Sequence, residues 1–143
     1  MLTGDQTYRK LWAAAVSRNP VLNMSYMLMA SDIPDWLYAC GLKKTISFSE
    51  LNAEQNAYFY SISPMSRVQN VCTPTLLLIG QKDLRVPPAQ AIYYYHALQE
   101  MKVDVRLLSY PEGTHSLLTP TETAIDSVLN SALWFDKYFG NVQ

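Results

Sequence analysis

Cysteine, net charge and long apolar runs are all scarce in this chain, and each absence narrows what it can be. The 143 residues include two cysteines, Cys40 and Cys72, which stand far apart without C-x-x-C spacing. This usage argues against a disulfide framework and favours reduced thiols, so we expect a cytoplasmic protein. The 11 basic and 12 acidic residues give a net charge of −1. Because they form no basic run, neither nucleic acid nor an anionic membrane surface is an expected partner.

Membrane insertion and export also lack a signal in the sequence. No apolar stretch is long enough to span a bilayer. Residues Met1–Asp5 lack the charged and apolar regions of a signal peptide. The length suits one domain with a sizeable core, and we expect that domain to make no membrane contact.

The spacing of apolar residues predicts a small parallel sheet flanked by helices. Thr75–Gly80 is a continuous apolar run closed by glycine, which is typical of a strand covered on both faces. Pro88 begins a helix that reaches Met101, and alternating apolar residues in Val103–Tyr110 predict a second strand. These three elements form a βαβ unit with a right-handed crossover. The apolar segment Trp12–Ser17 predicts a further strand.

Two other regions have a distinct organisation. Val21–Tyr60 is too long for an ordinary connection, which favours a lid or binding segment. Within it, Ser49 is the expected N-cap of a helix. The last helix follows the capping box Thr119–Glu122 and ends near Gly140. Its apolar residues form one stripe: Ile125, Leu129, Ala132, Phe135 and Phe139.

Two polar residues stand where predicted strands end. Asp83 follows Thr75–Gly80 in the segment Gly80–Pro87, and His115 follows Val103–Tyr110 in Pro111-Glu112-Gly113-Thr114-His115. Open α/β sheets carry their chemistry at the carboxyl ends of the strands. An acid followed by a histidine is also the order of the last two members of a Ser…Asp…His triad. These positions make Asp83 and His115 candidates for the acid and the general base.

The nucleophile that such a pair serves is missing from the sequence. No G-x-S-x-G, the sharp strand-to-helix turn that exposes an activated serine, occurs in the chain. Ser17 falls in a predicted strand and Ser116 is the neighbour of His115. The other serines weighed for this role lack the sharp turn: Ser25, Ser31, Ser61, Ser63 and Ser66. We therefore expect no working nucleophile in the chain.

Several sequence blocks together resemble the acylaminoacyl branch of the prolyl oligopeptidase family, and they cover nearly the whole chain. The segment Gly80–Pro87, which reads Gly-x-x-Asp-x-Arg-Val-Pro, marks the family, and Arg18-Asn19-Pro20 and Asp32–Trp36 narrow the resemblance to this branch. The full set of blocks is Val16–Asn23, Ser31–Trp36, Ser63–Met65, Thr73–Pro87, Val105–Pro111 and Thr114-His115.

The resemblance implies a fold and an activity. It implies that residues 1–143 form the C-terminal half of an α/β-hydrolase domain, a partial, mostly parallel sheet of about three strands flanked by helices. The nucleophile elbow and the family's β-propeller would lie outside these residues. It also implies a serine peptidase that releases N-acetylated amino acids from short blocked peptides through an acyl-serine intermediate. Asp83 would be the acid and His115 the base, with no metal or cofactor, and the chain alone would be inactive.

Three further residues are candidates for substrate binding, each beside a simpler structural alternative. Arg85 could bind a carboxylate near the site or form a structural ion pair. Arg18, just past the end of a predicted strand, could likewise contact the substrate or form an ion pair. Trp36, like Tyr26 and Tyr38, could shape an acyl or side-chain pocket or pack in the lid.

Two other functions stay open at this point. The first is a non-catalytic short subunit, or binding module, that pairs with the rest of a catalytic domain or another subunit through an exposed sheet edge. The second is an esterase or other oligopeptidase, since the fold alone does not fix the substrate.

Overall fold

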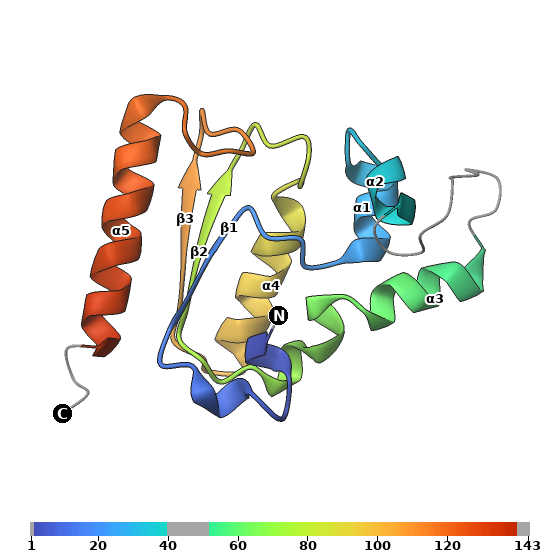
Figure 1. The fold of residues 1–143 in the computed structure, drawn as a ribbon, viewed down its shortest axis with the longest axis horizontal. Coiled ribbons are helices and arrows are strands. Elements are labelled where there is room, and N and C mark those ends of the chain that lie inside the picture. Colours follow the sequence, from blue (N-terminus) through green and yellow to red (C-terminus); the bar gives the residue numbers. More distant parts are fainter. Residues whose placement is uncertain (1, 40–51, 140–143) are drawn as a thin grey trace.

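The computed structural model describes residues 2–39 and 52–139, which form a parallel sheet between helices (Figure 1). The strands are β1 (Ala15–Arg18), β2 (Thr75–Gly80) and β3 (Val105–Tyr110), in the order β1-β2-β3. Both pairings are parallel. The three strands expected from the sequence are confirmed, although β1 begins at Ala15 rather than Trp12.

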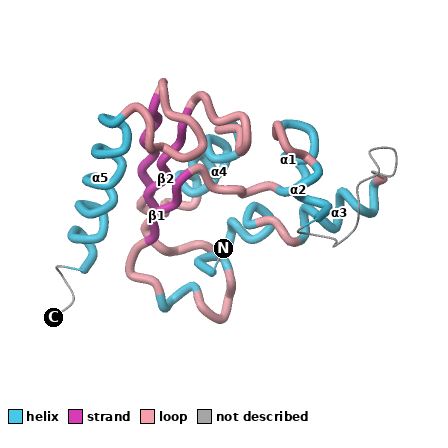
Figure 2. The backbone as a smooth tube through the Cα atoms, turned by 45° about the horizontal axis from the view of Figure 1, so that its top comes forward, coloured by secondary structure: helices cyan, strands magenta, loops and turns pink. Residues whose placement is uncertain are grey.

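Helices cover both faces of the sheet (Figure 2). All six residues of β2 are buried. Leu77 and Ile79 pack with α4 (Ala89–Glu100), whereas Leu76 and Leu78 pack in the cluster that holds Trp134 of α5 (Thr121–Phe139). Because successive side chains in a strand point to opposite faces, a strand between two helices is expected to be apolar on both faces, as Leu76–Ile79 of β2 are.

The described part of the connection between β1 and β2, residues 19–39 and 52–74, is mostly helical. It holds α1 (Met24–Ala30), α2 (Asp35–Leu37), α3 (Ala53–Ser61) and the 3₁₀ helix Pro64–Asn70. Met27, Leu37 and Phe59 from this region form a small core with Val86. The connection therefore packs against the segment that follows β2.

The cap of α3 differs from the expectation. Asn52 is the N-cap, and its side chain accepts a hydrogen bond from the Gln55 amide at 2.9 Å. Ser49, the expected cap, lies outside the described residues, as do Cys40 and Gly140.

Helix α5 has the expected position, but most of its apolar stripe faces away from the core. Its buried residues are Thr123, Ser127 and Trp134, whereas Ile125 is 64% and Leu129 54% exposed. Small hydroxyl residues let this helix lie close to the sheet. The exposed apolar stripe is a surface that a neighbour could cover.

The Tyr110 hydroxyl joins the end of β3 to α5. It donates a hydrogen bond to Asp126 Oδ2 at 2.9 Å. Burial, and then the bond to Asp126, raise the pKa of Tyr110. The hydroxyl therefore keeps its proton and this link throughout the neutral range.

Tyr94, on the inner face of α4, offers a test of the core. Its side chain is fully buried, and its hydroxyl has no hydrogen-bond partner within residues 2–39 and 52–139. Because a buried unsatisfied hydroxyl is costly, Tyr94→Phe is expected to raise the free energy of unfolding by about 1–2 kcal/mol in urea denaturation at pH 7. Tyr93→Phe is the matched control, since Tyr93 is 66% exposed, and it should change little.

The same variant has a pH signature. Burial raises the pKa of Tyr94 to about 12 from an ordinary value of 10.0. The unfolded chain therefore loses this proton first, and stability falls as the pH rises from 10 towards 12. Tyr94→Phe should make the alkaline loss shallower. A loss of stability at pH 7 would contradict the prediction.

No helix within the described ranges is both long and apolar enough to cross a membrane.

Candidate active site

Asp83 lies in the loop between β2 and α4, at the carboxyl edge of the sheet, and is 2% exposed. One carboxylate oxygen, Oδ1, accepts hydrogen bonds from the backbone amides of Arg85 and Val86, both at 2.9 Å. The other, Oδ2, lies 2.9 Å from Nδ1 of His115. These three contacts compensate for burying a charged group.

His115 lies in the loop after β3, within a turn closed by the Leu117 amide donating to the Thr114 carbonyl at 3.1 Å. Its side chain is 48% exposed. A carboxylate only accepts hydrogen bonds, so Nδ1 is the donor to Asp83, and in the neutral imidazole this places the lone pair on Nε2. Within the described part of the chain no group bonds to Nε2, which leaves it open to act as a base.

The two loops are in direct backbone contact. The Lys82 amide donates to the Gly113 carbonyl and the Gln81 amide to the Tyr110 carbonyl, each at 2.9 Å. A Cβ on Gly80 would lie 2.4 Å from the Gly113 oxygen, so only glycine permits this approach. This contact explains why Asp83 and His115 meet although 32 residues separate them.

Of the seven serines considered as nucleophiles, six have hydroxyls that are hydrogen-bonded to the backbone. Ser17 lies in β1 opposite Leu77, and Ser116 accepts a hydrogen bond from the Leu118 amide at 3.2 Å. Each of the remaining five candidates donates its hydroxyl to a backbone carbonyl: Ser25, Ser31, Ser61, Ser63 and Ser66. None of them is hydrogen-bonded to the imidazole.

A mostly apolar cavity of about 330 Å³ lies beside His115. Its volume is at the lower end of the range for small-molecule sites. Residues from the β1–β2 connection and from the Asp83 loop meet here, and the lining consists of Asn19, Val21, Met27, Ile33, Trp36, Arg85, Val86 and His115. Two of the three expected substrate-binding residues, Trp36 and Arg85, are thus brought next to the imidazole.

The third, Arg18, is not among these lining residues. Its Nη2 donates to the Ser116 carbonyl at 3.2 Å, in an exposed contact. Arg85 Nε is 3.3 Å from Asp32 Oδ1, and both side chains are substantially exposed, so this pair contributes little stability. The Arg85 guanidinium therefore has an ion-pair partner and also borders the cavity.

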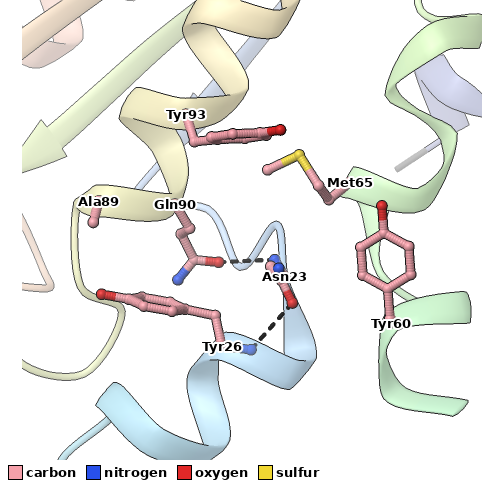
Figure 3. A pocket seen from close by; sticks show the side chains of 7 residues that line it. All are labelled: Asn23, Tyr26, Tyr60, Met65, Ala89, Gln90 and Tyr93. Atoms are coloured by element: carbon pink, nitrogen blue, oxygen red, sulfur yellow. Dashed lines mark hydrogen bonds between the residues drawn. The ribbon is translucent and has the colours of Figure 1, made fainter. Parts of the chain in front are cut away.

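The other two aromatic candidates lie elsewhere. Tyr26 lines a separate cavity of about 330 Å³ between α1, α3 and α4 (Figure 3), with Asn23, Tyr60, Met65, Ala89, Gln90 and Tyr93. Gln90 Oε1 there accepts from the Leu22 and Asn23 amides. Tyr38 is 4% exposed and packs edge-on against Phe59. Neither residue borders the cavity beside His115.

Sequence reasoning missed the residues that surround the pair. The sequence places Asn19 and Val86 within blocks that resemble the family, but nothing in it assigns either residue to the site. A usable signal existed, because Asn19 directly follows a strand and Val86 lies in the loop after another, at the edge where sites in parallel sheets form. No group of three or more His, Cys, Asp or Glu side chains that could hold a metal occurs among the described residues.

A parallel sheet with helices on both faces and an Asp–His pair at its carboxyl edge defines this chain as part of an α/β-hydrolase. Residues 2–142 match the prolyl oligopeptidase family. The chain belongs to that family, which confirms the resemblance drawn from the sequence blocks.

Relatives agree with this assignment, and solved structures share the fold. The chain is 42% identical over 128 residues to the acylamino-acid-releasing enzyme of Arabidopsis thaliana, a match that covers 89% of this chain and 17% of the relative. The human acylamino-acid-releasing enzyme is 39% identical over 137 residues, which is 94% of this chain and 18% of the relative. An acylaminoacyl peptidase structure from Pyrococcus horikoshii matches all of this chain and 22% of its own length, with a TM-score of 0.80 at 22% identity. The chain thus spans under a fifth of the length of these curated relatives.

Proposed function

We propose that this chain supplies the acid and the base of a serine peptidase that releases N-acylated amino acids from blocked peptides. The observation that carries this proposal is the buried Asp83 carboxylate 2.9 Å from Nδ1 of the half-exposed His115, beside an apolar cavity. Family membership, and relatives named acylamino-acid-releasing enzymes, support it. A cytoplasmic location stays part of the proposal.

In this mechanism His115 Nε2 takes the proton of a serine hydroxyl as that oxygen attacks the scissile carbonyl. The imidazolium then gives the proton to the leaving amine, which leaves an acyl-serine for water to hydrolyse. Asp83 keeps the proton on Nδ1 and stabilises the imidazolium. Its own two backbone donors, from Arg85 and Val86, hold the carboxylate in the orientation that this role needs.

The serine and the oxyanion donors would come from the remainder of a longer catalytic domain. Within the described residues β1 pairs only with β2, so its other edge is open, and α5 exposes the stripe that includes Ile125 and Leu129. We propose that this edge and stripe receive the rest of the domain, which would complete the sheet. Without it, the 143-residue chain would be inactive.

The cavity beside His115 would hold the substrate. Its apolar walls, including Trp36, suit an acyl group or an uncharged side chain, and Arg85 at its border would contact a substrate carbonyl or carboxylate. Arg18 would have no part in substrate binding, because it does not line the cavity and its contact to the Ser116 carbonyl is exposed. No metal or cofactor has a part in this mechanism.

The absence of a nucleophile predicts a clear labelling result. Treated with a fluorophosphonate probe, the 143-residue chain should show no covalent label by mass spectrometry. A chimaera in which residues 2–142 replace the matching segment of the Arabidopsis enzyme should be labelled, because it regains a serine and oxyanion donors. His115→Ala in the chimaera is the control for base-dependent labelling. Label on the isolated chain would overturn the proposal that it lacks a nucleophile.

The same chimaera separates the open alternatives. Release of an acetyl-amino acid from a blocked peptide supports the peptidase, whereas ester turnover alone supports an esterase. The open β1 edge gives some support to a non-catalytic binding subunit. A folded but unlabelled chimaera would favour that function.

A further inference from the structure

Asn19, the residue that follows β1, is buried in an unusual backbone conformation. It is 6% exposed, and its φ of 40° lies in the left-handed region. Asparagine tolerates this region better than most residues. Its backbone N–H donates to the Leu78 carbonyl at 2.8 Å, which adds one hydrogen bond to the β1–β2 pairing.

The Asn19 side chain bonds to both loops of the Asp–His pair. Its Nδ2 donates to the carbonyl oxygens of Thr114 at 3.1 Å and His115 at 2.8 Å. Its Oδ1 accepts from the Gly80 amide at 2.8 Å. One buried amide thus joins the end of β2, which leads into Asp83, to the backbone of His115 itself.

An amide is the group that these three partners require. Two carbonyls need donors and one N–H needs an acceptor, and a primary amide supplies both from one short side chain. An aspartate would keep the acceptor but set a negative charge against two carbonyl oxygens. An alanine would leave the buried Gly80 N–H and the two part-buried carbonyls without this partner.

Other anchors of the His115 loop fix different parts of it. Leu117 is fully buried in the cluster with Trp134, and Arg18 holds the Ser116 carbonyl from an exposed position. Asn19 alone among these contacts the carbonyl of His115 and the start of the Asp83 loop together. Without the Asn19 side chain, Leu117 and Arg18 would still anchor the His115 loop. The His115 imidazole would no longer be held at hydrogen-bonding distance from Asp83.

We propose that Asn19 is a positioning residue that holds His115 in hydrogen-bonding register with Asp83. The catalytic meaning of this role rests on the proposed function. The positioning itself does not, because it concerns hydrogen bonds within the chain.

The test follows the imidazole proton by NMR in the 143-residue chain labelled with ¹⁵N-histidine. The chain has two histidines, and exposed His96 on α4 serves as an internal reference. In the parent chain His115 should give a resolved Nδ1–H signal. Asn19→Asp should abolish that signal and speed amide exchange at Leu117 by about tenfold or more. The β2 amides other than that of Gly80, which donates to Asn19 Oδ1, and the ring ¹⁵N chemical shifts of His96 should stay unchanged.

Matched variants make the result decisive. Arg18→Ala, which removes an exposed contact to the same loop, should keep the His115 signal. Asn19→Gly removes the side-chain bonds without adding charge and still permits the positive φ, so it should reproduce Asn19→Asp. A wild-type His115 signal in either Asn19 variant would overturn the proposal. Global unfolding of both would also overturn it, since Asn19 would then be a general stability residue.

A second measurement keeps this inference separate from the proposed function. In the chimaera, Asn19→Asp should slow fluorophosphonate labelling at least tenfold relative to Arg18→Ala. If the NMR result holds but the chimaera never labels, the proposed function fails and the positioning role stands. If the parent chimaera labels and Asn19→Asp labels at the same rate, the positioning role fails.

Discussion

Replacing Asp83 with asparagine is expected to slow acyl-enzyme formation in the chimaera by about 10⁴-fold, the cost seen when a triad histidine is left in the wrong tautomer. The geometry gives the reason. The Arg85 and Val86 amides will keep an acceptor at the Oδ1 position. The new NH₂ group therefore faces His115 Nδ1, which must then accept, and the imidazole proton moves to Nε2.

Labelling rates with the fluorophosphonate probe measure this effect. Asp32→Asn is the matched control, since Asp32 lies 3.3 Å from Arg85 Nε, near the same site, but makes no contact with the imidazole. The labelling rate of Asp32→Asn should be within about threefold of the parent rate, because an exposed ion pair contributes little. Labelling of Asp83→Asn within tenfold of the parent would show that Asp83 is not the triad acid.

Gly80→Ala is expected to lower the free energy of unfolding by about 3 kcal/mol or more, the upper range for overpacking. Its Cβ would lie 2.4 Å from the Gly113 oxygen, 2.6 Å from the Gly113 carbon and 2.8 Å from the Thr114 oxygen. All three are backbone atoms, so no side chain can turn away. The β2 end and the His115 loop must separate instead.

Urea denaturation of the chain measures the loss, and Gly4→Ala is the matched control. A Cβ on Gly4 meets one backbone oxygen, that of Arg67, at 3.1 Å, and its other neighbours lie at 3.4 Å or beyond. This variant should cost less than about 1 kcal/mol. An equal loss of unfolding free energy in the two variants would show that the close approach of the two loops at Gly80 does not require glycine.

Helix α4 shows how far local patterns predict packing. The sequence predicts a helix from Pro88 to Met101, and the spacing of its apolar residues predicts one buried face with Ala91, Tyr95 and Leu98. Ala91 and Leu98 are buried as expected, but the fully buried tyrosine is Tyr94, and Tyr95 is only partly buried. Tyr94 and Tyr95 lie three and four residues after Ala91, and both spacings place a residue on the same side of a helix. The packing of the core decides which of the two is buried.

Helix α5 shows a stronger limit. Its apolar stripe is real, yet the side that meets the sheet carries Thr123 and Ser127. Hydrophobicity indicates which residues prefer to leave water, not which surface is available to cover them. That surface depends on what else is present beside the helix.

The sequence by itself determined the three strands, their parallel direction and the two polar residues at the ends of β2 and β3. These features depend on local chemistry: continuous apolar runs, glycine and proline at the ends, and an acid and a histidine directly after strands. Tertiary structure alone decided the hydrogen bonds of Asn19, the Gly80–Gly113 contact and the lining of the cavity beside His115. The physical reason is distance along the chain, because Asn19 meets partners 61, 95 and 96 residues away, and such contacts form only once the sheet has brought the loops together.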